Sequence, residues 1–236
     1  MKIRQSNIVV LTGSGISADS GLRTFRDNDG LWEEYPVEEV ATPHAWKSDP
    51  SMVWRFYQAR RRQLLDVKPN PAHIALTKLA EHAKELFLVT QNVDDLHERS
   101  GTKDVIHMHG QLRILRCEVT GKTEERMGPS DLESGFLFCT CCESASRLRP
   151  DIVWFGEQPM NMAEIYKAVE ACDVFIVVGS SGRVYPAAGL VGVADYSGAH
   201  TILINLEEPE NSTRFHEIHL GNAGKILPKL VAKWID

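Results

Sequence analysis

The feature that most constrains the fold is a short apolar run followed directly by a glycine-rich turn. Residues 8–11 are all aliphatic, which is the pattern of a strand buried on both faces of a parallel sheet. The Gly-Ser-Gly turn at 13–15 follows at once, and glycines let backbone N–H groups approach an anion closely. Alone, this is a weak form of the dinucleotide fingerprint. The polar segment that continues to Arg26 indicates a loop that covers a ligand.

Further apolar runs indicate more buried strands, separated by helical patterns. They lie at 86–89, 105–110, 152–155, 174–178 and 201–204. This alternation favours an α/β fold with a doubly wound, Rossmann-like parallel sheet. We expect residues 1–31, 86–116 and 150–236 to form that dinucleotide-binding domain. Residues 32–85 are expected to be a helical insert, and 117–149 a small, zinc-ribbon-like lobe that contains cysteines.

Charge and hydropathy exclude several classes of function. The 236 residues include 26 basic and 32 acidic side chains, a net charge of −6, which argues against general nucleic-acid binding. No apolar run reaches the roughly 18 residues that a transmembrane helix needs. The amino end leads straight into the first strand and leaves no room for a signal peptide. We therefore expect a cytoplasmic protein that binds neither membrane nor nucleic acid, with a monomer favoured.

A helix is expected from about residue 48 to 65, where Asp49 can cap it and Pro50 suits its first turn. Within it, Tyr57 and Arg60 lie three residues apart and therefore project from one side. On spacing alone, the ordinary interpretation is a tyrosine half-packed on the core beside a solvated arginine.

Polar side chains follow the second buried strand directly. Asn92 and Asp94 alternate after it, so they could face one side together at the edge where open α/β sheets bind ligands. The alternative is that either residue simply caps a short following helix. Further along, small hydroxyl residues at 180–181 and a carboxylate at 207 also follow buried strands, and suit contacts to phosphate or ribose.

Two histidines stand in the expected strand at 105–110. His107 and His109 are two apart and would point the same way in an extended chain. A lone histidine here would more often be structural, but the pair is suspicious, and Gly110 leaves space beside His109. An imidazole near its ordinary pKa can take a proton from a sugar hydroxyl.

Four of the five cysteines fall between Cys117 and Cys142, which indicates a metal cluster rather than a disulfide framework. Cys139 and Cys142 have the spacing at which two thiolates hold one zinc ion. Thr120 stands where the usual partner of Cys117 would be, and adjacent Cys141 and Cys142 are not expected to face one ion together. We expect one structural zinc held by Cys117, Cys139 and Cys142 with an unidentified fourth ligand. The alternative is a former zinc ribbon held by packing alone.

Taken together, these stretches resemble the sirtuins, the NAD-dependent protein-lysine deacylases, over nearly the whole chain. The likeness rests on GSGISADSGLRTFR at 13–26, TQNVDDLHERSG at 90–101, HG at 109–110, VWFGE at 153–157, GSS at 179–181 and NLE at 205–207. It is greatest to bacterial CobB-type sirtuins of the class that includes desuccinylases. FYQARRR at 56–62 is similar to the Tyr-x-x-Arg element of that class, which reverses the ordinary interpretation of Tyr57 and Arg60.

The resemblance implies a role for each matching residue. NAD would be bound by Gly13, Ser14, Gly15, Ala18, Phe25, Arg26, Gln91, Asn92, Asp94, Gly179, Ser180, Ser181, Asn205, Leu206, Glu207 and Ala223. An acylated lysine peptide or protein would be bound by Tyr57, Arg60, Val153, Phe155 and Gly156. His109 would be the general base. Ser14 departs from the alanine that many sirtuins carry, a small change that we expect to be tolerated.

The reaction that the resemblance implies consumes NAD and releases nicotinamide, free lysine and O-acyl-ADP-ribose. Malonyl and succinyl groups carry a carboxylate that would be costly to bury without a partner. Arg60 could give a forked, charge-assisted contact and Tyr57 a hydroxyl donor. The weaker alternatives are an ADP-ribosyltransferase, a non-catalytic NAD-binding module and a dehydrogenase.

Overall fold

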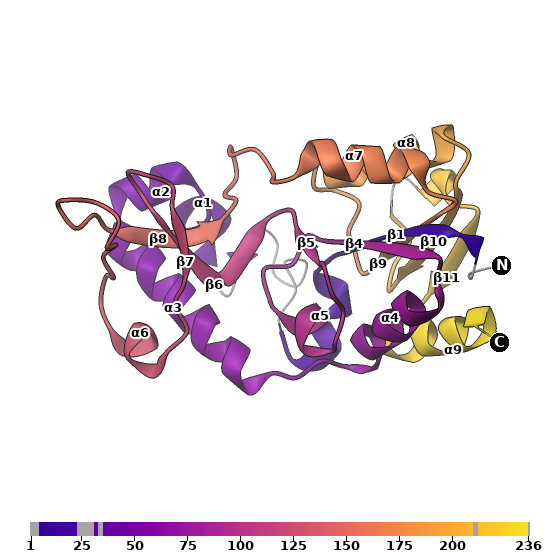
Figure 1. Ribbon diagram of the computed structural model, residues 1–236, viewed down its shortest axis with the longest axis horizontal. Coiled ribbons are helices and arrows are strands. Elements are labelled where there is room, and N and C mark those ends of the chain that lie inside the picture. The colour runs from indigo at the N-terminus through magenta and orange to yellow at the C-terminus, as the bar shows by residue number, and fades with distance from the viewer. Residues whose placement is uncertain (1–4, 23–30, 33–34, 210–211, 236) are drawn as a thin grey trace.

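The structure is a computed structural model that describes residues 5–22, 31–32, 35–209 and 212–235 (Figure 1). Figure 1 shows two lobes: a parallel sheet between helices, which holds both ends of the chain, and a smaller lobe of helices and short antiparallel strands. Among the described residues, no helix combines the length and the apolar character needed to cross a bilayer.

Six parallel strands form the sheet of the large lobe, in the order β11-β10-β9-β1-β4-β5. They are β1 (Asn7–Thr12), β4 (Glu85–Thr90), β5 (Ile106–His107), β9 (Val174–Val178), β10 (His200–Asn205) and β11 (Glu217–Leu220). Counted along the chain, the order is 3-2-1-4-5-6, that of dinucleotide-binding domains. The connection after β1 leads to one side of the sheet, and the connection after β9 leads to the other. A crevice therefore lies where β1 and β9 end. The predicted fold class is confirmed.

Alternate side chains of each central strand enter two different cores. Ile8 and Val10 pack with α4 (Pro71–His82) and α9 (Ala223–Ile235) on one face of the sheet. Val9 and Leu11 pack with α7 (Met162–Ala171) and α8 (Leu190–Tyr196) on the other (Figure 1). Burial on both faces explains why residues 8–11 are uniformly aliphatic.

Helix α4 packs on the large lobe, although the sequence places it within the expected insert at 32–85. Its Leu76 and Leu79 are buried in the core that also contains α9. Asn70 begins α4 by accepting the N–H of Ala72 at 2.9 Å, and its Nδ2 donates to the carbonyl of Ile16 at 2.7 Å. The proline-rich corner at 69–71 therefore separates α4 from the preceding helix and joins it to the loop after β1.

The small lobe contains the sheet β7-β6-β8, which is antiparallel throughout. Its strands are β6 (Gly110–Cys117), β7 (Thr123–Glu125) and β8 (Leu148–Ile152). Because β6 starts at Gly110, residues 110–116 belong to this sheet rather than to the parallel one. The remaining short elements are β2 (Leu31–Trp32), β3 (Tyr35–Pro36), α1 (Val37–Val40), α2 (Pro43–Ser48), α5 (Leu96–Arg99) and α6 (Pro129–Glu133).

The long helix α3 (Pro50–Asp66) forms one wall of the small lobe and confirms the predicted helix. Asp49 caps it by accepting the N–H of Met52 at 2.9 Å. Its buried face carries Val53, Phe56, Tyr57 and Leu64, which share one core with the aromatic side chains of α2 and of the segment after β8.

Candidate functional site

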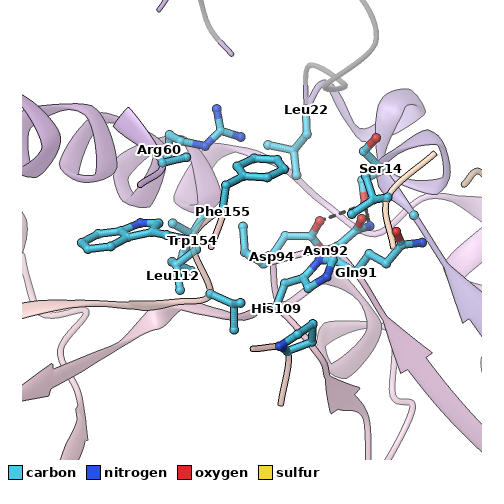
Figure 2. Close-up of a pocket in the computed structure, with 18 of the residues that line it drawn as sticks. Ser14, Leu22, Arg60, Gln91, Asn92, Asp94, His109, Leu112, Trp154 and Phe155 are labelled. Carbon is cyan, nitrogen blue, oxygen red and sulfur yellow. Dashed lines mark hydrogen bonds between the residues drawn. The ribbon is translucent and has the colours of Figure 1, made fainter. Parts of the chain in front are cut away.

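A cavity of about 580 Å³ lies between the two lobes, beyond the carboxyl ends of β1, β4 and β9. Figure 2 shows its polar end, formed by Ser14, Gln91, Asn92 and Asp94. Arg60, Leu112 and Trp154 lie toward the opposite end, and His109 stands between the two groups. The position agrees with the rule that open α/β sheets bind ligands where their connections diverge.

The two glycines after β1 allow close backbone packing. Gly13 and Gly15 donate their N–H groups to the carbonyls of Val178 and Gly179, each at 2.9 Å. A Cβ on Gly13 would lie 2.7 Å from the carbonyl oxygen of Gly179, closer than real Cβ contacts come. These amides therefore bond within the protein rather than to an anion, which differs from the expectation for the glycine turn. Ser14, between them, faces the cavity.

Several of the expected NAD-binding residues lie at or after the ends of β9, β10 and β11. Ser180 and Ser181 line the cavity, and Gln91 Nε2 donates to Ser180 Oγ at 2.8 Å. Asn205 Nδ2 donates to the carbonyls of Ser180 at 3.2 Å and Glu207 at 2.7 Å, so it joins two ligand-side loops. Two of the expected NAD-binding residues outside the cavity, Gly15 and Ala18, follow β1. The others outside it lie at or after the ends of β9, β10 and β11, and they are Gly179, Asn205, Leu206, Glu207 and Ala223. The remaining candidates, Phe25 and Arg26, are outside the described residues.

A buried hydrogen-bond chain fixes the polar end of the cavity. Ser17 Oγ donates to Asp94 Oδ2 at 2.9 Å and accepts from Asn92 Nδ2 at 3.1 Å. Asp94 Oδ1 also accepts the N–H of Leu96, the first residue of α5, although the N-cap of that helix is Asp95. Burial raises the pKa of the Asp94 carboxyl group. Sequence reasoning assigned no role to Ser17, because a serine in a polar loop carries no signal of its partner.

The structure separates the two histidines. His107 is buried, and its ring nitrogens contact the carbonyl of Asn92 at 3.2 Å and Glu98 Oε1 at 2.6 Å. His109 lies beyond β5 in a turn, so the alternation expected for an extended strand stops before it. Only His109 lines the cavity, and His107 is engaged within the protein.

The tautomer of His109 follows from its contact. Its Nδ1 lies 3.1 Å from the carbonyl oxygen of Gln91. A carbonyl oxygen only accepts, so in the neutral ring the proton is on Nδ1 and the lone pair on Nε2. Burial lowers the pKa of this imidazole, against the opposing effect of the Gln91 carbonyl. The ring therefore stays neutral to lower pH than an exposed histidine and can accept a proton at Nε2.

Tyr57 and Arg60 are both buried and both line the cavity, with exposed fractions of 0% and 7%. This differs from the ordinary interpretation of a half-packed tyrosine beside a solvated arginine. Trp154 Nε1 donates to the Tyr57 hydroxyl at 2.9 Å, and the guanidinium of Arg60 lies over the ring of Phe56. Burial raises the pKa of the Tyr57 hydroxyl well above its usual range, so it remains a donor.

The segment after β8 borders the cavity at Val153, Phe155 and Gly156. Val153 donates its N–H to the carbonyl of His109 at 3.0 Å, and Phe155 to that of Ala41 at 2.9 Å. Both N–H groups are therefore engaged within the protein.

The cysteine cluster of the small lobe has four members. The Sγ atoms of Cys117, Cys139, Cys141 and Cys142 lie within 4.8 Å of one another. Three of the separations are 3.5, 3.6 and 3.9 Å, and zinc–sulfur bonds of about 2.3 Å in a tetrahedron require about 3.8 Å. The cluster therefore fits one zinc ion. Cys141 completes the set, which corrects the expectation that it could not face the ion beside Cys142.

Thr120 remains in contact with the cluster, although it cannot replace a thiolate. Its hydroxyl lies 3.2 Å from Cys141 Sγ, and its N–H points to Cys117 Sγ at 3.5 Å. Cys141, which contacts Thr120, thus supplies the fourth thiolate that position 120 lacks.

A 3-2-1-4-5-6 sheet, an adjoining four-cysteine lobe and a cavity between them define a dinucleotide-binding protein with a structural metal site. The sequence model of the Sir2 family matches residues 13–186. The chain belongs to the Sir2 family, the sirtuins, as its motifs indicated.

Individual relatives are similar over almost the full chain. An NAD-dependent protein deacylase of Shewanella oneidensis is 51% identical over 95% of this chain and 93% of its own length. One of Salmonella typhimurium is 49% identical, over 97% and 84% respectively. Among solved structures, a Sir2 homologue in complex with NAD has a TM-score of 0.88 at 38% identity, covering 99% of this chain and 91% of its own.

A second solved structure, described as Sir2 with a p53 peptide and NAD⁺, has a TM-score of 0.83 at 30% identity. It covers 97% of this chain and 93% of its own.

Proposed function

We propose that this chain is an NAD-dependent protein-lysine deacylase that removes acetyl groups and the acidic malonyl and succinyl groups. The observation that carries the proposal is the geometry of His109, a neutral imidazole whose Nε2 is unprotonated and which lies between a polar and a largely apolar end of one cavity. The named relatives support the deacylase activity. A cytoplasmic, monomeric state remains an expectation from the sequence.

When bound, NAD would supply an activated glycosidic carbon and a ribose hydroxyl. The residues of the protein would position these groups and remove the proton from the hydroxyl. The polar end suits the nicotinamide ribose, because Gln91, Asn92 and Asp94 present amide and carboxyl groups that their own hydrogen bonds hold in place. A fixed arrangement lowers the entropic cost of aligning two reactants. His109 Nε2 accepts the proton of a ribose hydroxyl, and its Nδ1 bond to Gln91 keeps the ring oriented.

The far end of the cavity suits an acyl chain with a terminal carboxylate. Arg60 and Tyr57 are one helical turn apart on α3 and both line the cavity. A carboxylate buried without a partner would be unfavourable, and a guanidinium with a neutral hydroxyl satisfies it. Acetyl-lysine is smaller and uses the same channel without that contact.

The test is a panel of acetyl-, malonyl- and succinyl-lysine peptides with NAD, read by mass spectrometry. Arg60→Met should lower kcat/KM for succinyl-lysine by about tenfold or more, the loss of one charge-assisted contact, and change deacetylation far less. Arg55→Met is the matched control, since Arg55 is exposed on the same helix. No NAD-dependent product from any peptide would refute the proposal, and ADP-ribose found on a protein acceptor without deacylation would favour a transferase.

A further inference from the structure

One hydrogen bond joins the two lining segments at the acyl end of the cavity. Trp154 Nε1 donates to the hydroxyl oxygen of Tyr57 at 2.9 Å, and both side chains are almost fully buried. Trp154 lies in the segment that follows β8, whereas Tyr57 lies in the middle of α3. The two positions are 97 residues apart in the chain.

The direction of this bond determines where the tyrosine hydrogen can point. An indole N–H can only donate, so the phenol oxygen must be the acceptor. The hydroxyl hydrogen of Tyr57 is then turned away from Trp154. A phenylalanine at position 154 would remove this donor, and with it the constraint that the indole N–H places on the direction of the hydroxyl hydrogen.

Trp154 is itself held on two sides. The guanidinium carbon of Arg149 lies 3.6 Å from the centre of its ring. Arg149 makes a two-pronged ion pair with Glu157, at 2.8 and 2.9 Å. Glu157 Oε2 in turn accepts the backbone N–H of Trp154 at 2.9 Å. The indole is therefore fixed through its face and through its backbone, as a residue that orients another must be.

The next side chain of the same segment is far more exposed. Phe155 also lines the cavity and is 49% exposed, whereas Trp154 is 2% exposed. The segment that borders the substrate thus carries, on its inner side, the group that orients Tyr57.

We propose that Trp154 is a positioning residue for acidic acyl groups, which directs the Tyr57 hydroxyl toward the substrate carboxylate beside Arg60. This inference rests on the proposed function. It assigns the preference for acidic acyl groups to three side chains rather than two, and makes the third act only through Tyr57.

The test compares kcat and KM of Trp154→Phe, Tyr57→Phe and the double variant on succinyl- and acetyl-lysine peptides. Trp154→Phe should raise the KM for the succinyl peptide about three- to tenfold, because one hydrogen bond to a charged group is weakened. The KM for the acetyl peptide should change by less than about twofold. Tyr57→Phe should show the same pattern, and the double variant should lose no more than Tyr57→Phe alone.

A second replacement guards against misfolding. Single-site incorporation of 3-benzothienylalanine at position 154 keeps the bicyclic ring and lacks the N–H, and should reproduce the Trp154→Phe pattern. Equal losses on both peptides, no loss, or an additive double variant would each overturn the inference while the proposed function stands. A wild-type protein without activity on acidic acyl groups would overturn the inference together with that part of the proposed function.

Discussion

The carbonyl oxygen of Gln91 determines which ring nitrogen of His109 can accept a proton. The bond from Nδ1 to Gln91 places the lone pair on Nε2, and burial keeps the ring neutral. His107, two residues earlier, has both nitrogens engaged within the protein. The two side chains are the same and lie in the same short stretch of sequence. The chemical difference between the two imidazoles therefore comes from their hydrogen-bond partners.

The lowered pKa of His109 gives a pH prediction. A base whose pKa is lowered from the ordinary histidine value of about 6.5 stays unprotonated to lower pH, so kcat/KM should begin to fall only on the acid side of pH 6.5. The measurement is the pH profile of deacetylation at low NAD concentration, with circular dichroism at each pH to confirm folding. His109→Ala is the control, which should bind NAD and lack turnover. A half-maximal rate at pH 6.5 or above would contradict the assignment.

Strand β6 begins at a residue that tolerates only glycine. Gly110 has a positive φ of 81°, and a Cβ there would overlap the carbonyl oxygen of Asp151 on the paired strand β8. This close pairing sets the direction of the chain just after His109. The small-lobe sheet and the orientation of the imidazole thus depend on the same backbone position.

Substitution at Gly110 should therefore cost more than conformational strain alone. Gly110→Ala should lower the free energy of unfolding by roughly 2–4 kcal/mol, because strain and overlap add. Gly121→Ala is the matched control: φ there is 71°, and an added Cβ meets nothing within 4 Å. That variant should lose about 1–2 kcal/mol. Urea denaturation of both variants measures the difference, and equal losses would show that the overlap is relieved at no cost.

The elements differ in how far the sequence determines them. Strands β1, β4, β9 and β10 and helix α3 are predictable because their signals are local: uniform apolar runs and an Asp-Pro cap. The strand expected at 152–155 is wrong, since β8 ends at Ile152 and belongs to the small-lobe sheet. The placement of α4 is not predictable, since an apolar face does not say which lobe it covers. The full burial of Tyr57 and the place of Cys141 in the cysteine cluster also escape prediction. They depend on contacts with Trp154 and with the other three cysteines, which only the fold brings together.

The cysteine cluster shares one core with the end of the cavity that Tyr57 lines. Cys117 and Cys139 are buried in the cluster of side chains that also contains Tyr57 and Trp154. The core of the parallel sheet is separate from it. A structural change in the cysteine-containing lobe should therefore disturb the residues around Tyr57 and Trp154 more than those at the ends of the parallel strands.

Removal of the metal should loosen one lobe selectively. Chelation, or Cys141→Ser, should lower the zinc content measured by mass spectrometry and raise amide hydrogen exchange in β6, β8 and α3, with β1, β4 and β9 protected as before. Cys172→Ser is the control, because Cys172 lies in the large lobe outside the cluster. Full zinc content in Cys141→Ser would remove Cys141 from the ligand set.

The alternation along β1 has one more consequence. Since Ile8 and Val10 serve one core and Val9 and Leu11 the other, neither helical layer can detach without exposing the strand that supports both. We therefore expect the lobe with the parallel sheet to unfold as one cooperative unit. The cysteine-containing lobe has a separate core. Local unfolding of the cysteine-containing lobe should therefore leave the parallel sheet intact.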